Sequence, residues 1–343
     1  LKIFKSIYIT FTEIENQNNL DCNIFLEKQT KMYYALEAEG TNSSGNLGAS
    51  LNLRFGNKNA FKGAENFNFK FKGSLEARKN LNTSESFFNT WEIGAETSLN
   101  IPRLVVIKPV ENLIFKSVRN RHTNFSLSFM KQQRPDFTRS ILKTTLFGYN
   151  FKSKKNLTYS LNLAEFSYIR MFNESADFEE QYLTNDFLID QYSNHLIAGS
   201  SYTVIYNNQK INKIQNYVFI KGRFEMSGLT LNTLANAFNF EEDEDENYTL
   251  FENRFTQYLI AELDARRYFV ITKQNIIAIR TYIGVGYPYG NSQQIPAQKQ
   301  FFAGGTNGLR AWNAFSLGPG SYQANNNNNS SINYFLGDIK LES

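Results

Sequence analysis

Apolar and polar residues alternate along most of this chain of 343 residues, and that period of two limits its fold more than any other feature. The clearest segments are 47–56 (LGASLNLRFG), 67–74 (FNFKFKGS) and 91–100 (WEIGAETSLN). Successive side chains of a β-strand point to opposite faces, so each segment would have one apolar and one polar face. The pattern therefore predicts an all-β protein built from long, two-faced strands.

Counting from Met32, the alternation predicts twelve strands, most of roughly ten residues. Few helical stretches interrupt them, so consecutive strands should pair as an antiparallel meander. The predicted strands lie near 32–40, 46–56, 64–76, 89–100, 122–132, 140–151, 156–167, 196–206, 215–226, 256–271, 275–287 and 335–343.

The connections between these strands alternate in length. Short ones fall at 57–62, 152–155, 207–214 and 272–274, whereas long polar ones fall around Asp136 and at 168–195, 227–255 and 288–334. Short turns at one rim and long loops at the other are typical of a transmembrane β-barrel of the outer-membrane type. The exception is 101–121, a long segment on the short-turn side.

A soluble β-sandwich or a solenoid would also alternate, because any half-buried sheet does. The polar face, however, carries many charges, and placing Lys70 and Lys72 at the lipid midplane would cost about 2–4 kcal/mol each. The apolar face carries rings near strand ends, as the aromatic belt of a membrane barrel does. Those rings are Phe55, Trp91, Tyr149, Tyr159, Tyr206 and Tyr287. The barrel, with its charges lining a wet interior, is the favoured interpretation.

Composition excludes several other classes. No apolar run reaches the roughly 18–20 residues of a membrane-spanning helix. One cysteine (Cys22) and two histidines leave no multi-cysteine or histidine-rich metal site, and neither histidine lies near a nucleophile-elbow motif. A net charge of +4 argues against nucleic-acid binding. The acidic run 241–246 lacks the ligand spacing of a calcium loop. We expect no catalytic residue, metal or cofactor.

The most specific string is KQFFAGGTNGLRAWNAFSLGPGSY, residues 299–322. It resembles the inward-folded loop of the BamA/TamA outer-membrane assembly superfamily, in which an aromatic-Gly-Gly stretch precedes a Val-Arg-Gly-aromatic tetrad. Ala311 stands where most of the superfamily has glycine, which resembles the Bacteroidota TamA-like branch. The matching loop residues are Phe301, Phe302, Gly304, Gly305, Gly308, Leu309, Arg310, Ala311 and Trp312.

The resemblance implies a domain organisation. Residues 1–31 would be the C-terminal end of the last POTRA domain, and 32–343 the barrel with an inward-folded loop at 288–334. The family's barrel has sixteen strands, so about twelve would be covered and the chain would be incomplete at its C-terminus. Arg310 would clamp the loop to the wall, with Asp338 and Glu342 as possible acidic partners.

The resemblance also implies a function: assembly, insertion or translocation of client proteins through a lateral gate between the first and last strands. The expected partners are unfolded outer-membrane clients, the lipid bilayer and periplasmic or lipoprotein subunits, in the outer membrane of a Gram-negative bacterium. A two-partner-type secretion pore and a passive porin or structural barrel remain alternatives. The gate residues on the first strand would be Tyr33, Tyr34, Leu36, Glu37 and Gly40.

Overall fold

We analysed a computed structural model of the chain. It describes most of the predicted strands and part of the connections. The described residues are 3–14, 19–43, 46–77, 88–105, 118–135, 137–153, 156–172, 194–210, 213–238, 240–242, 247–250, 253–292, 294–301 and 338–342.

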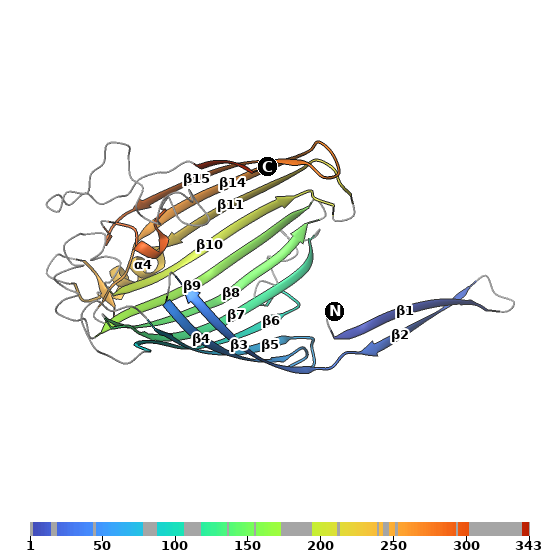
Figure 1. Cartoon of the computed structure of the whole chain (residues 1–343), viewed down its shortest axis with the longest axis horizontal. Helices are drawn as coiled ribbons and strands as arrows, with labels where there is room; N and C mark the ends of the chain where they lie inside the picture. The colour runs from blue at the N-terminus through green and yellow to red at the C-terminus, as the bar shows by residue number, and fades with distance from the viewer. Residues whose placement is uncertain are drawn as a thin grey trace.

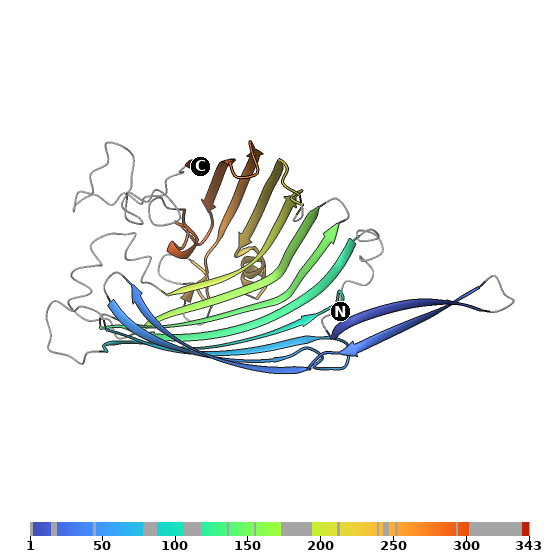
Figure 2. The same ribbon diagram turned by 45° about the vertical axis from the view of Figure 1, so that its right-hand side comes forward.

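Twelve antiparallel strands form one large sheet that curves into a wall (Figures 1 and 2). Each strand pairs with its sequence neighbours in the sheet, and β3 and β16 are the two edges among the described residues. The strands are β3 (Met32–Ser43), β4 (Asn46–Asn57), β5 (Asn66–Ala77), β6 (Thr90–Ile101), β7 (Val118–Gln133), β8 (Thr138–Ser153), β9 (Leu157–Phe172), β10 (His195–Asn207), β11 (Tyr217–Ser227), β14 (Tyr258–Val270), β15 (Ile276–Pro288) and β16 (Asp338–Glu342).

This architecture confirms the predicted all-β meander, and the strands fall where the alternation placed them. One connection differs. Only four residues separate β7 from β8, so the expectation of a long loop around Asp136 is wrong. The Arg134 amide donates to the Phe137 carbonyl at 2.8 Å and closes a tight hairpin. The polar residues of this connection are those of a tight turn and do not indicate a long loop.

The N-terminal residues form a separate hairpin of β1 (Phe4–Glu13) and β2 (Leu20–Lys28). The hairpin extends beyond the rim that carries the short turns (Figure 1). Its large side chains are unusually exposed, including Tyr8 and Phe25. Its assignment to a POTRA domain stays a prediction.

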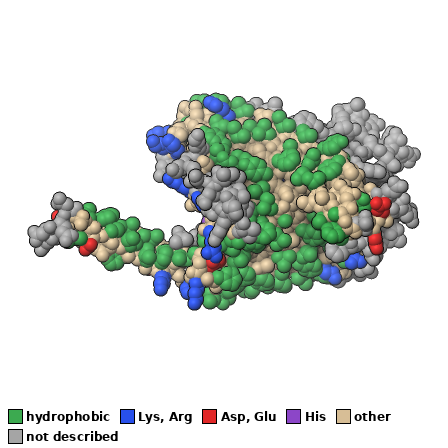
Figure 3. Space-filling model, turned by 180° about the vertical axis from the view of Figure 1, so that it is seen from behind, with side chains coloured by type: hydrophobic (Ala, Val, Ile, Leu, Met, Phe, Trp, Pro, Cys, Tyr) green, Lys and Arg blue, Asp and Glu red, His purple; other side chains and the backbone are tan. Residues whose placement is uncertain are grey.

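The sheet has two chemically different faces. The outer face carries exposed hydrophobic side chains such as Leu53, Leu127 and Phe224. The opposite, inner face buries polar groups such as Asn52 and Asp264. Seen from behind, hydrophobic side chains cover most of the wall, and the visible charges gather mainly toward the strand ends (Figure 3). Since a strand's side chains alternate, this division fixes the register of every strand.

One predicted belt aromatic is buried. Tyr149 on β8 is only 2% exposed because Leu104, in the connection after β6, packs over it. The Tyr149 hydroxyl donates to the Val105 carbonyl at 2.9 Å, which satisfies the phenol at this buried position. The described start of the long connection 101–121 thus folds back onto the outer face.

Several short elements complete the described structure. They are α4 (Leu229–Phe238), β12 (Thr249–Leu250), β13 (Asn253–Arg254) and the 3-10 turn η1 (Ala297–Lys299). Among the described helices, none combines the length and the hydrophobicity needed to cross a membrane.

The two faces can be tested with neighbouring residues of β7. Leu127 lies on the outer face and Ser126 on the inner face. In lipid vesicles, Leu127→Arg should lower the free energy of unfolding by about 2–4 kcal/mol, because the predicted barrel would place the guanidinium in hydrocarbon. Ser126→Arg should change it by less than about 0.5 kcal/mol. Urea titration of the vesicle-inserted protein measures both; equal effects would contradict the assignment of faces.

Candidate functional site: the inner wall at the base of the long loop

The segment that follows β15 packs onto the inner face of the sheet. Ile295 is buried against Ile197, Tyr258 and Ile260, and Phe301 packs at the edge of this cluster. Two glycines of β15 make room for the loop. A Cβ on Gly284 would lie 2.6 Å from the Phe301 ring, and one on Gly286 would collide with Ile295. A larger residue at either position would force the Phe301 ring or the end of the Ile295 side chain to move.

A buried carboxylate on β11 holds the same segment. Glu225 is 3% exposed and accepts hydrogen bonds from Lys299 Nζ at 2.5 Å and Tyr258 Oη at 2.7 Å. Arg223 also contacts this carboxylate. Three donors around one carboxylate compensate for its removal from water, and charge-assisted bonds of this kind are the stronger ones. Lys299 thus fixes the loop to the wall.

The charged network continues across the neighbouring strands. The Glu262 carboxylate accepts from Arg223 Nη1 at 3.3 Å and from Tyr282 Oη at 3.1 Å. Two residues further along β14, Asp264 accepts paired bonds from Arg266 and from Arg280 at 2.7–3.2 Å. Such forked arginine–carboxylate contacts fix geometry as well as charge. The inner wall of β11, β14 and β15 is therefore rigid and fully paired at these carboxylates.

Gln257, just before β14, organises the turn after β15. Its carbonyl accepts from the Tyr289 amide at 3.0 Å, and its side-chain oxygen accepts from the Asn291 amide at 2.6 Å. Gly290 adopts φ +56° between them, a conformation that favours glycine. The Tyr289 hydroxyl donates to the Ser227 carbonyl at 2.8 Å, and burial raises the pKa of this phenol. The loop base is thereby held at several independent points.

Most residues of the predicted loop motif fall outside the described residues, so the structure places only Phe301. Its ring lies 6.3 Å from that of Tyr282, edge to face. The motif residues outside the description are Phe302, Gly304, Gly305, Gly308, Leu309, Arg310, Ala311 and Trp312. Asp338 and Glu342 occupy β16 at the positions opposite Tyr282 and Ala278. The pairing of Arg310 with either acid stays a prediction.

The predicted gate residues lie together on β3, which pairs only with β4 among the described strands. On the inner face, Tyr33 donates to Asn68 Oδ1 at 3.0 Å, and Glu37 pairs with Arg54 at 3.0 Å. On the outer face, Tyr34 and Leu36 are 76% and 67% exposed. β3 is thus fastened on one side and open on the other in the described structure.

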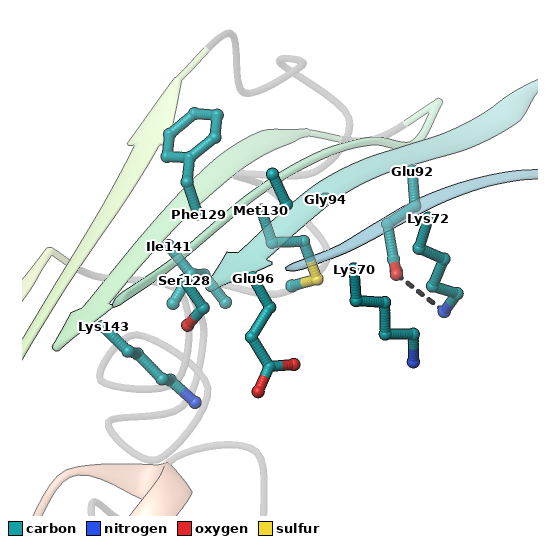
Figure 4. Close-up of a pocket in the computed structure, with 11 residues that line it drawn as sticks. Lys70, Lys72, Glu92, Gly94, Glu96, Ser128, Phe129, Met130, Ile141 and Lys143 are labelled. Atoms are coloured by element: carbon teal, nitrogen blue, oxygen red, sulfur yellow. Dashed lines mark hydrogen bonds and ion pairs between the residues drawn. The ribbon is translucent and has the colours of Figure 1, made fainter. Parts of the chain in front are cut away.

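A recess of about 200 Å³ lies on the inner wall of β5 to β8 (Figure 4). Lys72 is paired with Glu92 at 2.9 Å, whereas Lys70, Glu96 and Lys143 point into the same space. The recess is an ion-lined, wet surface, in keeping with a polar interior.

The residues that hold the loop base were not singled out from the sequence. Lys299 opens the recognised string, yet its partner Glu225 lies 74 residues away. The alternation of β11 places Glu225 on the inner face of the sheet. It does not predict that Glu225 pairs with Lys299. Gln257 belongs to no recognisable motif, so its role in the turn after β15 could not be predicted from the sequence.

The comparisons with known proteins agree with this architecture. No protein-family model matches the sequence, and no curated protein does. The fold of the described residues is similar to that of a solved BamA structure. That structure is BamA from Haemophilus ducreyi lacking POTRA domains 1–3, with a TM-score of 0.55 and 12% sequence identity. The match covers 92% of this chain and 52% of that one, so the chain spans about half its length.

The Glu225 contact can be tested by a substitution that preserves shape. Glu225→Gln should lower the free energy of unfolding by about 2 kcal/mol, because Lys299 and Arg223 lose a charged acceptor. It should also speed tryptic cleavage after Lys299. Glu39→Gln is the matched control, since Glu39 is exposed and accepts only a 3.5 Å bond from Ser50. Unchanged cleavage after Lys299 would show that this contact does not hold the loop.

Proposed function

We propose that this chain forms the wall of an outer-membrane assembly factor, which inserts or translocates client proteins by pairing their strands with β3. The observation that supports the proposal is the likeness of the described sheet to a solved BamA structure; β3 is the first strand of that sheet. An unpaired strand edge offers a row of amide and carbonyl groups that a partner strand can satisfy.

The side-chain environment of β3 suits such an exchange. Tyr33 and the Glu37–Arg54 pair fasten the inner face of β3 to its neighbours, so the strand stays in place when its edge is engaged. On the outer face, Gly40 leaves open space where a Cβ would lie. A client strand that pairs there would extend the outer apolar face into the bilayer. Its backbone groups would be satisfied throughout, as hydrocarbon requires.

The remaining features of the family resemblance belong to the same proposal. Closure into sixteen strands would place the final strand opposite β3 and make the seam a lateral gate. Arg310 would fix the inward-folded loop to an acidic wall residue, and residues 1–31 would be the C-terminal end of the last POTRA domain. The proposed role is that of the Bacteroidota TamA-like branch. The protein would work with periplasmic or lipoprotein subunits in the outer membrane of a Gram-negative bacterium. The energy would come from client folding and the transfer of apolar surface into lipid, without a nucleotide.

Site-specific photocrosslinking tests the proposed route. A photoreactive amino acid at Leu36 on β3 should capture client precursors during their assembly. The same amino acid at Ile283 on β15, also on the outer face, should capture few, because β15 is paired on both sides.

Crosslinking also separates the alternatives. Capture along the inner wall, for example at Lys70, with none at Leu36 would support a secretion pore instead. No capture at any position, together with steady ion conductance, would support a passive porin. Either outcome would contradict pairing of clients with β3.

A further inference from the structure

Helix α4 combines two properties that a helix in a water-exposed loop rarely shows. No charged residue occurs between Glu225 and Glu241, so the helix and both flanks are uncharged. Yet Leu229, Leu234 and Phe238 are 47%, 44% and 72% exposed. A ten-residue helix that buries one apolar stripe ordinarily turns charged residues toward water on the other. Here the exposed side carries no charge: Leu229, Leu234, Ala237 and Phe238 share it with the neutral polar residues Thr230, Thr233 and Asn236.

The position of α4 explains what the first side contacts. Leu231 and Ala235 pack on Leu196 of β10 and on Phe255. Phe166 and Tyr168 of β9 border the same cluster, and Tyr168 is the register partner of Leu196. These wall residues share the outer face with the exposed Tyr202. The helix therefore lies outside the wall, next to its apolar surface and at the long-loop rim.

Two polar side chains of α4, Thr233 and Asn236, form hydrogen bonds within the protein. Thr233 Oγ1 donates to the Leu229 carbonyl at 2.9 Å, and Asn236 Nδ2 donates to the Asn232 carbonyl at 2.8 Å. Asn236 Oδ1 in turn accepts from the Tyr248 hydroxyl at 3.0 Å. Side chains that bond back to their own helix lose less when they leave water. The acidic run that follows, beginning at Glu241, marks where the chain returns to solvent.

We infer that α4 is an interfacial helix whose exposed side, Leu234 and Phe238 above all, lies in the boundary between lipid headgroups and acyl chains. The occupant of this face is the bilayer, because the face continues the outer apolar surface of β9 to β11 and carries no charge that a polar partner could pair. An uncharged helix can lie there by apolar burial alone. The inference rests on the outer wall facing lipid, but not on β3 receiving clients.

Fluorescent depth probes test this in the full chain. In a Cys22→Ser background, an environment-sensitive fluorophore is attached at Phe238→Cys or, as a second site, Leu234→Cys. The protein is reconstituted in phosphatidylcholine vesicles that contain lipids spin-labelled near the headgroup or deep in the acyl chain. Both probes should be quenched by the shallow label at least about twofold more strongly than a probe at Glu242→Cys.

A probe at Phe224→Cys, on the outer face of β11, is the matched control and should respond most to the deep label. If the Phe224 probe lies in lipid while the α4 probes are quenched by aqueous iodide, the inference is wrong and the wall assignment stands. If the α4 probes are shielded from both quenchers, a protein covers the helix, which also overturns it. If the Phe224 probe lies in water, the membrane placement itself fails.

Discussion

In the proposed membrane placement, the structure depends on one constraint: a backbone that crosses hydrocarbon must satisfy every amide and carbonyl within the protein. Twelve antiparallel strands meet it through continuous ladders from β3 to β16. The side chains then have two environments, and their strict alternation divides them. Apolar groups such as Leu127 and Phe224 take the outer face, while carboxylates such as Asp264 and Glu225 are held by arginine, lysine and tyrosine on the inner one.

The described contacts differ between the two ends of the sheet. Around β14 and β15, forked ion pairs and glycine-lined contacts join the wall to the base of the long loop. At β3, in the described structure, only one ladder is formed, and the neighbouring contacts lie on the β4 side. In the proposed function, the wall around β14 and β15 would stay in place while β3, at the far end of the sheet, exchanges strands.

The sheet could be predicted from the sequence because its cause is local. Period two and the cost of placing Lys70 in lipid fix both strand positions and faces. Contacts made across long separations could not be predicted. Lys299 meets Glu225 only after folding, and Tyr149, which alternates as a lipid-facing ring, is covered by Leu104. Helix α4 was missed because its apolar residues lie on two sides, which weakens the helical period in the sequence.

Amide hydrogen exchange of β3 tests the central claim most directly. The protein in vesicles is compared with and without a peptide that corresponds to the last strand of a client barrel. If the free edge receives client strands, the amides of β3 that point away from β4 will exchange more slowly when the peptide is present, while those of β14 stay unchanged. Equal exchange along β3 in both samples, at a peptide concentration that saturates binding, would contradict the account.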